Sequence, residues 1–337
     1  MKKYSSLALA LVMAFCCTSV AFATTQNNAP SYDSCIADVV DASGTEYLFD
    51  PETNEYLPIC HVEDEVAAIS LKNGHDYEFE TKFEQKRLSD ALMSKGVMQV
   101  DSESNTPIPG GVGYGAYFTS DFQSDFTTGT TLFYNIICPS KAGGDVDDHL
   151  YLTSTNRAAK GVEAFISYYK QDNPYFKVYD WARSSTDRWQ VSMTYDDLAD
   201  YLTTKTISGV NRQCVTVQNR TAQSSSTEWK NIVWLKNYKT NSYDQVYTYT
   251  YKATLSDQRD SHYGSWGPIV ETFQDSYNKD TNIIGFYNIN LMSKTTAYSN
   301  NTWQEWELLT DEVSYIRNDK LGFSTVFLSP NYTFGVH

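Results

Sequence analysis

The 337-residue sequence is short of basic residues, histidine and proline. Its 26 lysines and arginines face 41 aspartates and glutamates, which gives a formal net charge of −15 at pH 7. Such an acidic surface repels phosphate backbones and anionic lipid headgroups, so nucleic acid and membrane surfaces are unfavourable partners. No window after the first residues approaches the roughly 18 consecutive apolar residues of a membrane helix. The composition therefore predicts a protein that does not insert into a membrane.

The motifs of several enzyme classes are also missing. With only 5 histidines, the chain has neither the His-Glu-x-x-His motif of zinc proteases nor the Gly-x-Ser-x-Gly elbow of serine hydrolases. No cysteine or histidine spacing indicates a zinc site. The glycine-rich run 111–115 lacks the following helix that a nucleotide-binding loop requires. These absences disfavour metalloprotease, serine-hydrolase and nucleotide-dependent chemistry, and no cofactor is expected.

The first residues have the organisation of an export signal. A basic start at 1–3 is followed by an apolar stretch to Phe15, and Ala21–Ala23 supplies small residues where signal peptidase reads. We expect cleavage before Thr24 and a secreted or periplasmic mature protein. A retained anchor, or a lipid attached at Cys16, is the alternative. Loss of two lysines with the signal makes the mature chain more acidic still.

Four cysteines lie outside the predicted signal, namely Cys35, Cys60, Cys138 and Cys214. In an oxidising compartment they predict two disulfides, for which three connectivities are possible. Pairing of sequence neighbours would join Cys35 to Cys60 and Cys138 to Cys214. Closing the first of these loops would stabilise the fold by roughly 3 kcal/mol on the chain-entropy model.

Aromatic residues are abundant, with 26 tyrosines, 16 phenylalanines and 7 tryptophans. They recur in short runs in which apolar and polar residues alternate with the period of a half-buried strand. Many short strands separated by polar turns predict an all-β fold, a jelly-roll (concanavalin-like) β-sandwich. The predicted strands include residues 131–137, 162–169, 175–181, 213–218, 231–235, 245–251, 283–287 and 323–328.

The chain divides into a small amino-terminal part and a large sandwich. After the signal (1–23), residues 24–100 should form a disulfide-tied hairpin, with Gly44 and Asn54 at its turns, and a short helix within Tyr77–Met98. Residues 101–116 are rich in glycine and proline and predict a linker. Residues 117–337 should form the β-sandwich, interrupted by a short helical turn near 195–202.

One cluster of aromatic and charged residues is typical of sugar recognition. Asp180, Trp181 and Arg183 follow one predicted strand, and Trp266 lies in a constrained Gly/Pro turn. Aromatic rings stack on the apolar faces of sugars, and paired Asp and Arg bind hydroxyls. The alternative is an Asp–Arg pair at a strand end with the tryptophans in the core.

Two carboxylates in apolar strands, Glu163 and Glu271, could act as the acid and base of glycoside cleavage. They are far apart in the sequence, and the alternative is that each simply pairs at a sheet edge. Three aspartates in one turn, Asp145, Asp147 and Asp148, are weak candidates for calcium ligands, although the spacing is not that of an EF-hand. A solvated acidic turn is the other interpretation.

The segments 161–165, 176–183, 266–273 and 327–332 resemble a family of secreted bacterial and fungal β-sandwich proteins for which no activity or catalytic residues are established. The resemblance covers about residues 117–337. More remotely, the strand pattern is similar to that of concanavalin-type lectins and glucanases, which is a likeness of fold alone.

Three functions remain open on this evidence. The leading hypothesis is a secreted, acidic binding protein that recognises glycan or another cell-surface ligand through its aromatic and Asp/Arg side chains. The second is a polysaccharide hydrolase or lyase that uses Glu163 and Glu271. The third is a secreted toxin or host-interaction factor.

Overall fold

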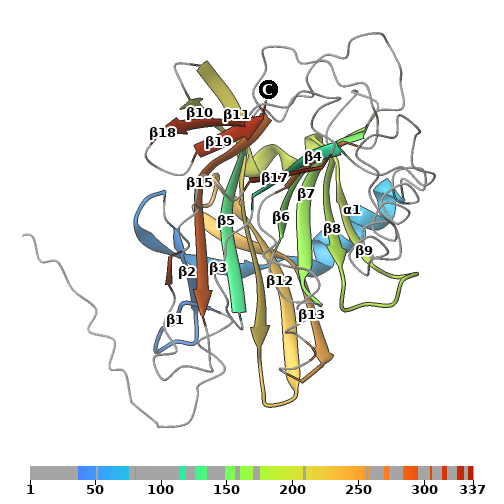
Figure 1. The fold of residues 1–337 in the computed structure, drawn as a ribbon. Coiled ribbons are helices and arrows are strands. Elements are labelled where there is room, and N and C mark those ends of the chain that lie inside the picture. The colour runs from blue at the N-terminus through green and yellow to red at the C-terminus, as the bar shows by residue number, and fades with distance from the viewer. Residues whose placement is uncertain are drawn as a thin grey trace, which may run out of the picture. The chain divides into compact units, whose positions relative to one another are not determined.

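The fold is known from a computed structural model of the chain (Figure 1). The predicted signal peptide 1–23 lies outside the described residues and stays a prediction. The structure describes residues 37–50, 52–75, 80, 114–118, 126–134, 149–155, 160–169, 175–207, 210–254, 257, 269–272, 284–294, 304–305, 313–316, 325–329 and 333–336.

The described strands form two sheets, as the sequence predicts for a β-sandwich. The larger sheet has twelve strands in the order β1-β2-β3-β13-β12-β11-β5-β15-β19-β18, with β10 beside β11 and β16 beside β15. Its strands are β1 (Val39–Val40), β2 (Glu46–Asp50), β3 (Glu55–His61), β5 (Phe126–Tyr134), β10 (Thr203–Ile207), β11 (Val210–Gln223), β12 (Glu228–Asn237), β13 (Ser242–Lys252), β15 (Ile284–Lys294), β16 (Gln304–Glu305), β18 (Thr325–Ser329) and β19 (Thr333–Val336).

The second sheet has seven strands in the order β17-β4-β14-β6-β7-β8-β9. Figure 1 shows β6 to β9 running side by side, with helix α1 (Glu63–Asn73) next to β8 and β9. The strands of this sheet are β4 (Tyr114–Phe118), β6 (His149–Thr155), β7 (Val162–Tyr169), β8 (Tyr175–Asp180), β9 (Trp189–Met193), β14 (Ile269–Thr272) and β17 (Val313–Ile316).

The sequence patterns explain why β7 and β8 form where they do. β7 and β8 consist mostly of aromatic, β-branched and other apolar residues, which suit a pleated surface that is covered on both faces. The burial agrees, because residues 162–167 and 176–180 are all buried. The two strands pair antiparallel, with Val162 opposite Asp180 and Glu163 opposite Tyr179. This register decides which side chains meet on each face of the sheet.

The amino-terminal hairpin is part of the larger sheet. Gly44 (φ 87°) and Asn54 (φ 59°) occupy its two turns in the left-handed region, as their positions in the sequence predict. β3 pairs parallel with β13, placing Ile59 beside Tyr243. The hairpin therefore adds three strands to the sheet instead of forming a separate unit.

Helix α1 follows β3 and was not predicted. Its first turn carries Glu63, Asp64 and Glu65, which favour the positive end of the helix dipole, and it ends before Gly74 (φ 72°). Asn73 Nδ2 donates to the Ser192 carbonyl at 2.8 Å, so the helix is attached to β9. The helix that was predicted within 77–98 lies outside the described residues except for Glu80.

The cysteines do not support the predicted hairpin disulfide. Cys60 is a free, exposed cysteine on β3, and Cys35 lies outside the described residues. Cys214 is buried on β11, while Cys138 is also outside the described residues. One further prediction needs correction, because β4 begins at Tyr114, within the range expected to be a linker.

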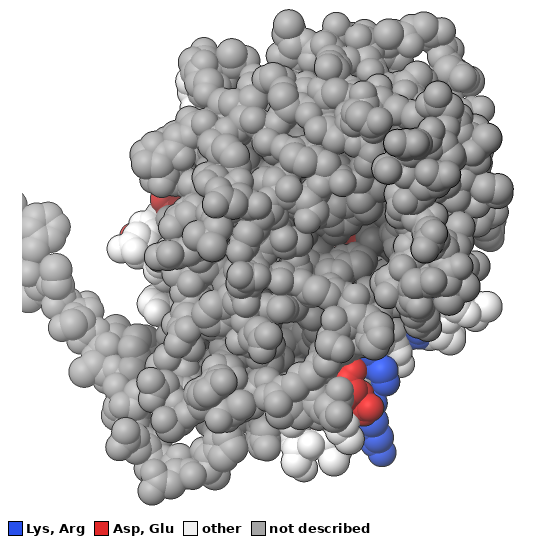
Figure 2. Space-filling model, viewed as in Figure 1, with Lys and Arg blue, Asp and Glu red and all other residues white. Residues whose placement is uncertain are grey.

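The described helices are all too short or too polar to cross a bilayer. On the face in Figure 2, a group of acidic and basic side chains lies together at the lower edge. Charges of both signs are therefore exposed there, despite the acidic composition of the whole chain.

Candidate active site on the seven-stranded sheet

The two faces of β7 and β8 carry different polar groups. Asp180 faces the twelve-stranded sheet, because its carboxylate accepts hydrogen bonds from Asn231 of β12 at 2.7 Å and from Tyr247 of β13 at 2.6 Å. Glu163 and its partner Tyr179 occupy the next position along the strands and point to the opposite face. Two buried carboxyls thus lie on opposite sides of one strand pair.

Glu163 is wholly buried, with a relative exposure of 0%. The indole Nε1 of Trp181 donates a hydrogen bond of 2.9 Å to Glu163 Oε1. The Trp181 ring meets Tyr179 edge to face with centroids 5.0 Å apart. Arg188 covers the Trp181 ring at 5.0 Å and donates to the Tyr179 hydroxyl at 2.9 Å. We call Glu163, Tyr179, Trp181 and Arg188 the Glu163 cluster.

The turn after β8 brings this cluster together. Trp181 N donates to the Gly161 carbonyl at 3.0 Å, and Asp180 N donates to the Arg188 carbonyl at 2.9 Å. The first bond fixes Trp181 beside the start of β7, and the second closes the loop that leads to β9. Glu163, two residues beyond Gly161, is therefore within reach of the indole.

A second buried carboxyl lies on the same face as the Glu163 cluster. Lys177 is two residues before Tyr179 and is 2% exposed, and its Nζ lies 4.0 Å from Oε1 of Glu80. His75 Nδ1 contacts both Glu80 oxygens at 3.1 Å. Sequence reasoning missed Glu80. The available signal was Lys177, a charged residue inside an apolar strand, which requires an anionic partner when buried.

The Asp180 side of the strand pair is a closed network. Burial raises the pKa of Asp180, although hydrogen bonds from Tyr247, Ala182 and Asn231 oppose the rise. Burial and the neighbouring Asp180 carboxylate also raise the pKa of the Tyr247 hydroxyl. Arg183 Nε donates to that hydroxyl at 2.9 Å, and its guanidinium stacks on Tyr249 at 4.1 Å. These contacts join the two sheets.

The residues predicted to bind a sugar are divided between the two faces. Trp181 is turned towards Glu163, whereas Asp180 and Arg183 face β13. Trp266 lies outside the described residues. The predicted calcium ligands Asp145, Asp147 and Asp148 lie outside them as well. Within the described ranges, no group of three or more His, Cys, Asp or Glu side chains could hold a metal ion.

The second predicted catalytic carboxylate, Glu271, can be placed by register. Glu271 on β14 is opposite Tyr151, which is opposite Ser167 of β7. Ser167 is four residues from Glu163, so Glu271 and Glu163 share one face of the sheet. Two strand spacings and four residues separate their Cα atoms by roughly 16 Å.

Among the comparisons with known proteins, only the one with solved structures found matches. No protein-family model matches the chain, and no curated protein matches it. A structure of SCP-B, an eqolisin-family peptidase in complex with a tripeptide, covers 66% of this chain and 96% of its own, with 12% identity and a TM-score of 0.33. Two structures of scytalido-glutamic peptidase with transition-state analogues have the same coverage, 14% identity and TM-scores of 0.31 and 0.33. At these values the activity of the peptidases does not transfer to this chain.

The prediction of a secreted binding protein for glycan or another cell-surface ligand is wrong. Its residues do not form one binding site, because Asp180 is wholly buried between the sheets and Trp181 is held against Glu163. The aromatic and charged residues that are neighbours in the sequence, and that resembled a sugar-binding site, pack on opposite faces of one strand pair.

Proposed function

We propose that the protein is a secreted hydrolase in which the Glu163 carboxyl acts as general acid and base. The observation that carries the proposal is a wholly buried carboxyl held at 2.9 Å by an indole N–H among aromatic rings. The predicted signal peptide is the reason for proposing a secreted protein. The carboxylates on this face of the sheet are the reason for proposing that it cleaves a polymer.

Burying a carboxyl in such surroundings costs several kcal/mol unless it is fully compensated. An apolar side chain would fill the same position among the rings without that cost. Carboxyls that are buried among aromatic side chains at enzyme sites serve there as general acids or bases. Glu163 therefore has the environment of a reacting group.

The proton transfers are simple. The Glu163 carboxylate removes a proton from water while the water oxygen attacks the electrophilic carbon of the scissile bond. The carboxylic acid then returns that proton to the departing amine or alcohol, so Glu163 ends the cycle ionised. Trp181 is a positioning residue. Its indole N–H holds one carboxyl oxygen of Glu163, and this fixes the direction in which the other oxygen points.

A second carboxyl would assist in cleaving polysaccharide. Glu271 shares the face of Glu163, and Glu80 is buried on the same side beside Lys177. Glycosidases place two carboxyl groups about 5 to 9.5 Å apart. The register places the Cα atoms of Glu163 and Glu271 roughly 16 Å apart. Peptide substrates are included in the test because the structurally similar enzymes bind peptides.

The test compares Glu163→Gln with wild type on two substrate panels, quenched fluorescent peptides and soluble β-glucan or xylan. Glutamine keeps the shape and still accepts the indole hydrogen bond, so the fold should be retained. We expect one panel to be hydrolysed and Glu163→Gln to lower kcat by about 10²- to 10⁴-fold. Trp181→Phe keeps a ring but removes the donor, and should lower kcat by about tenfold.

Glu228→Gln is the matched control, because Glu228 lies at the start of β12 in the other sheet. It should leave the rate unchanged, and thermal unfolding of all variants should coincide within a few degrees. Full activity of Glu163→Gln, or no hydrolysis on either panel by wild type, would overturn the proposal.

A further inference from the structure

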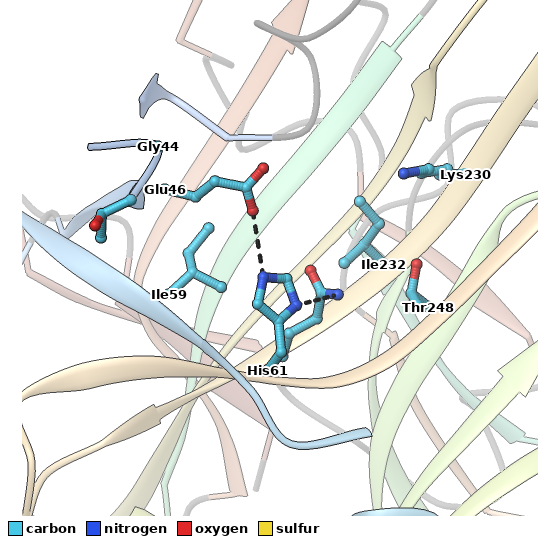
Figure 3. A pocket seen from close by; sticks show the side chains of 9 residues that line it. Gly44, Glu46, Ile59, His61, Lys230, Ile232 and Thr248 are labelled. Atoms are coloured by element: carbon cyan, nitrogen blue, oxygen red, sulfur yellow. Dashed lines mark hydrogen bonds and ion pairs between the residues drawn. The ribbon is translucent and has the colours of Figure 1, made fainter. Parts of the chain in front are cut away.

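An open cavity of about 500 Å³ lies on the twelve-stranded sheet, beside the amino-terminal hairpin. The hairpin contributes Glu46 of β2 with Ile59 and His61 of β3, and the sheet contributes residues of β12 and β13. Figure 3 shows these side chains around one space. The volume is that of a pocket for a small molecule.

Two isoleucines line this cavity among polar residues. Ile59 and Ile232 are buried at 8% and 1% exposure, and they belong to the small core between the hairpin and the sheet. Figure 3 shows Ile59 beside Glu46 and Ile232 beside Lys230, with His61 between the two isoleucines. A hydrocarbon segment that crosses the cavity would lose its own contact with water where it meets the isoleucines.

The two charges on opposite sides of this cavity do not neutralise each other. Glu46 Oε2 lies 3.5 Å from His61 Nε2, within the distance of an ion pair. The Lys230 ammonium makes neither an ion pair nor a hydrogen bond with any of the described residues. His61 is in turn occupied on its other side, because Nδ1 lies 3.2 Å from Gln245 Nε2 and 3.5 Å from Glu63 Oε1.

We infer that this cavity binds a small, extended zwitterion, with its cationic group at Glu46, its anionic group at Lys230 and a hydrocarbon segment over Ile59 and Ile232. An ω-amino carboxylate has this chemistry. Separated charges are essential to the fit, because Glu46 and Lys230 lie on opposite sides of the cavity. The inference is independent of the proposed hydrolase, since the cavity is on the other sheet from Glu163.

Binding is tested on the full mature chain by isothermal titration with 6-aminohexanoate. Hexanoate and hexylamine are the matched probes, because each keeps the hydrocarbon segment and one of the two charges. We expect 6-aminohexanoate to bind with a dissociation constant of about 1 mM, as suits so small a ligand. Each single-charge probe should bind at least about tenfold more weakly.

Variants locate the binding. Glu46→Gln and Lys230→Gln should each weaken 6-aminohexanoate binding about tenfold or more, since each removes one counter-charge. Lys252→Gln removes an exposed cation at the end of β13, outside the cavity, and should change nothing. Thr248→Trp, at an exposed lining position, should fill the space and abolish binding even if either charge variant folds poorly.

Three results would overturn the inference: no heat of binding with 6-aminohexanoate, equal binding of hexanoate or hexylamine, or unchanged binding by both charge variants. Hydrolase assays of the same variants separate the two proposals. Glu46→Gln and Lys230→Gln should retain the activity that Glu163→Gln loses.

Discussion

Two buried carboxyls in this protein, Asp50 and Glu163, lie on different sheets and have different partners. Asp50, in the hairpin, is wholly buried, and Lys236 Nζ lies 2.7 Å from its Oδ2. Lys236 also reaches Glu52 at 3.0 Å, and Tyr243 donates to the other Asp50 oxygen at 3.0 Å. Glu163 is as deeply buried, and the indole Nε1 of Trp181 donates a hydrogen bond of 2.9 Å to its Oε1.

The different partners suit different roles, one in holding the fold together and one in the proposed reaction. A buried carboxylate in direct contact with a lysine can join two elements of the fold. An indole N–H supplies a hydrogen bond without a charge. In the proposed hydrolase, Asp50 attaches the hairpin and Glu163 is the reacting group, and the predictions below test this division.

The largest effect should follow Lys236→Met. The substitution leaves Asp50 buried without its cation, and breaking a buried ion pair on one side costs about 3 to 5 kcal/mol. Urea unfolding should show this loss in the free energy of unfolding. Lys239→Met is the control, because Lys239 pairs with Asp200 on the surface, where the side chains are 70% and 46% exposed. It should cost less than about 1 kcal/mol. Equal losses in both variants would remove the distinction between the two kinds of carboxyl.

Much of the fold could be predicted from alternation alone. The predicted strand 162–169 coincides with β7, and 175–181 ends one residue beyond β8. Aromatic and β-branched residues on a period of two leave few other arrangements for such segments. The turns at Gly44 and Asn54 were also predicted correctly, because only a few residue types adopt a positive φ readily.

The site was harder to predict because it depends on register. Trp181 was taken as a sugar-stacking ring, and no local pattern indicated that it would donate to Glu163, 18 residues earlier. That contact exists because Asp180 pairs with Val162, and a slip of one residue would send Glu163 to the other face. The parallel pairing of β3 with β13 joins segments more than 180 residues apart, which sequence periodicity does not encode.

Helix α1 illustrates a different limit. Its apolar residues form no continuous stripe, and Val66 is its only buried residue, so hydrophobic periodicity did not reveal it. Its terminal signals, the acidic first turn and Gly74, were nevertheless present in the sequence. The residues typical of helix ends would have predicted this helix, whereas the spacing of its apolar residues did not.

A smaller effect should appear in the pH dependence of stability. Burial raises the pKa of Asp180 above its ordinary value of 3.8, so the folded state holds this proton more tightly than the unfolded chain. Its contribution to stability is therefore complete below pH 3.8 and is lost as the pH rises through the raised pKa. In Asp180→Asn this fall should be absent, and the melting temperature should vary less from pH 4 upwards.

Asp197 supplies a control of opposite sign. Burial opposes the shift, but hydrogen bonds from Thr194 and Asn73 lower its pKa overall. Its contribution is present above the ordinary pKa and is lost as the pH falls. Asp197→Asn should thus flatten the acid side of the melting profile and leave the higher side unchanged. If Asp180→Asn altered only the acid side, the assignment of a raised pKa to Asp180 would be wrong.

The smallest effect should follow substitution of Cys60. This substitution tests which interactions attach the hairpin to the sheet. If the Asp50–Lys236 pair and the small hairpin core hold these strands, the exposed thiol of Cys60 contributes nothing. Cys60→Ser should then change the free energy of unfolding by no more than about 0.5 kcal/mol. A thiol reagent should label native wild type at this residue without denaturant, and the variant should lack that reaction. A loss of about 2 to 5 kcal/mol, the usual effect of removing a native disulfide, would instead show that a covalent link shares the role here given to Lys236.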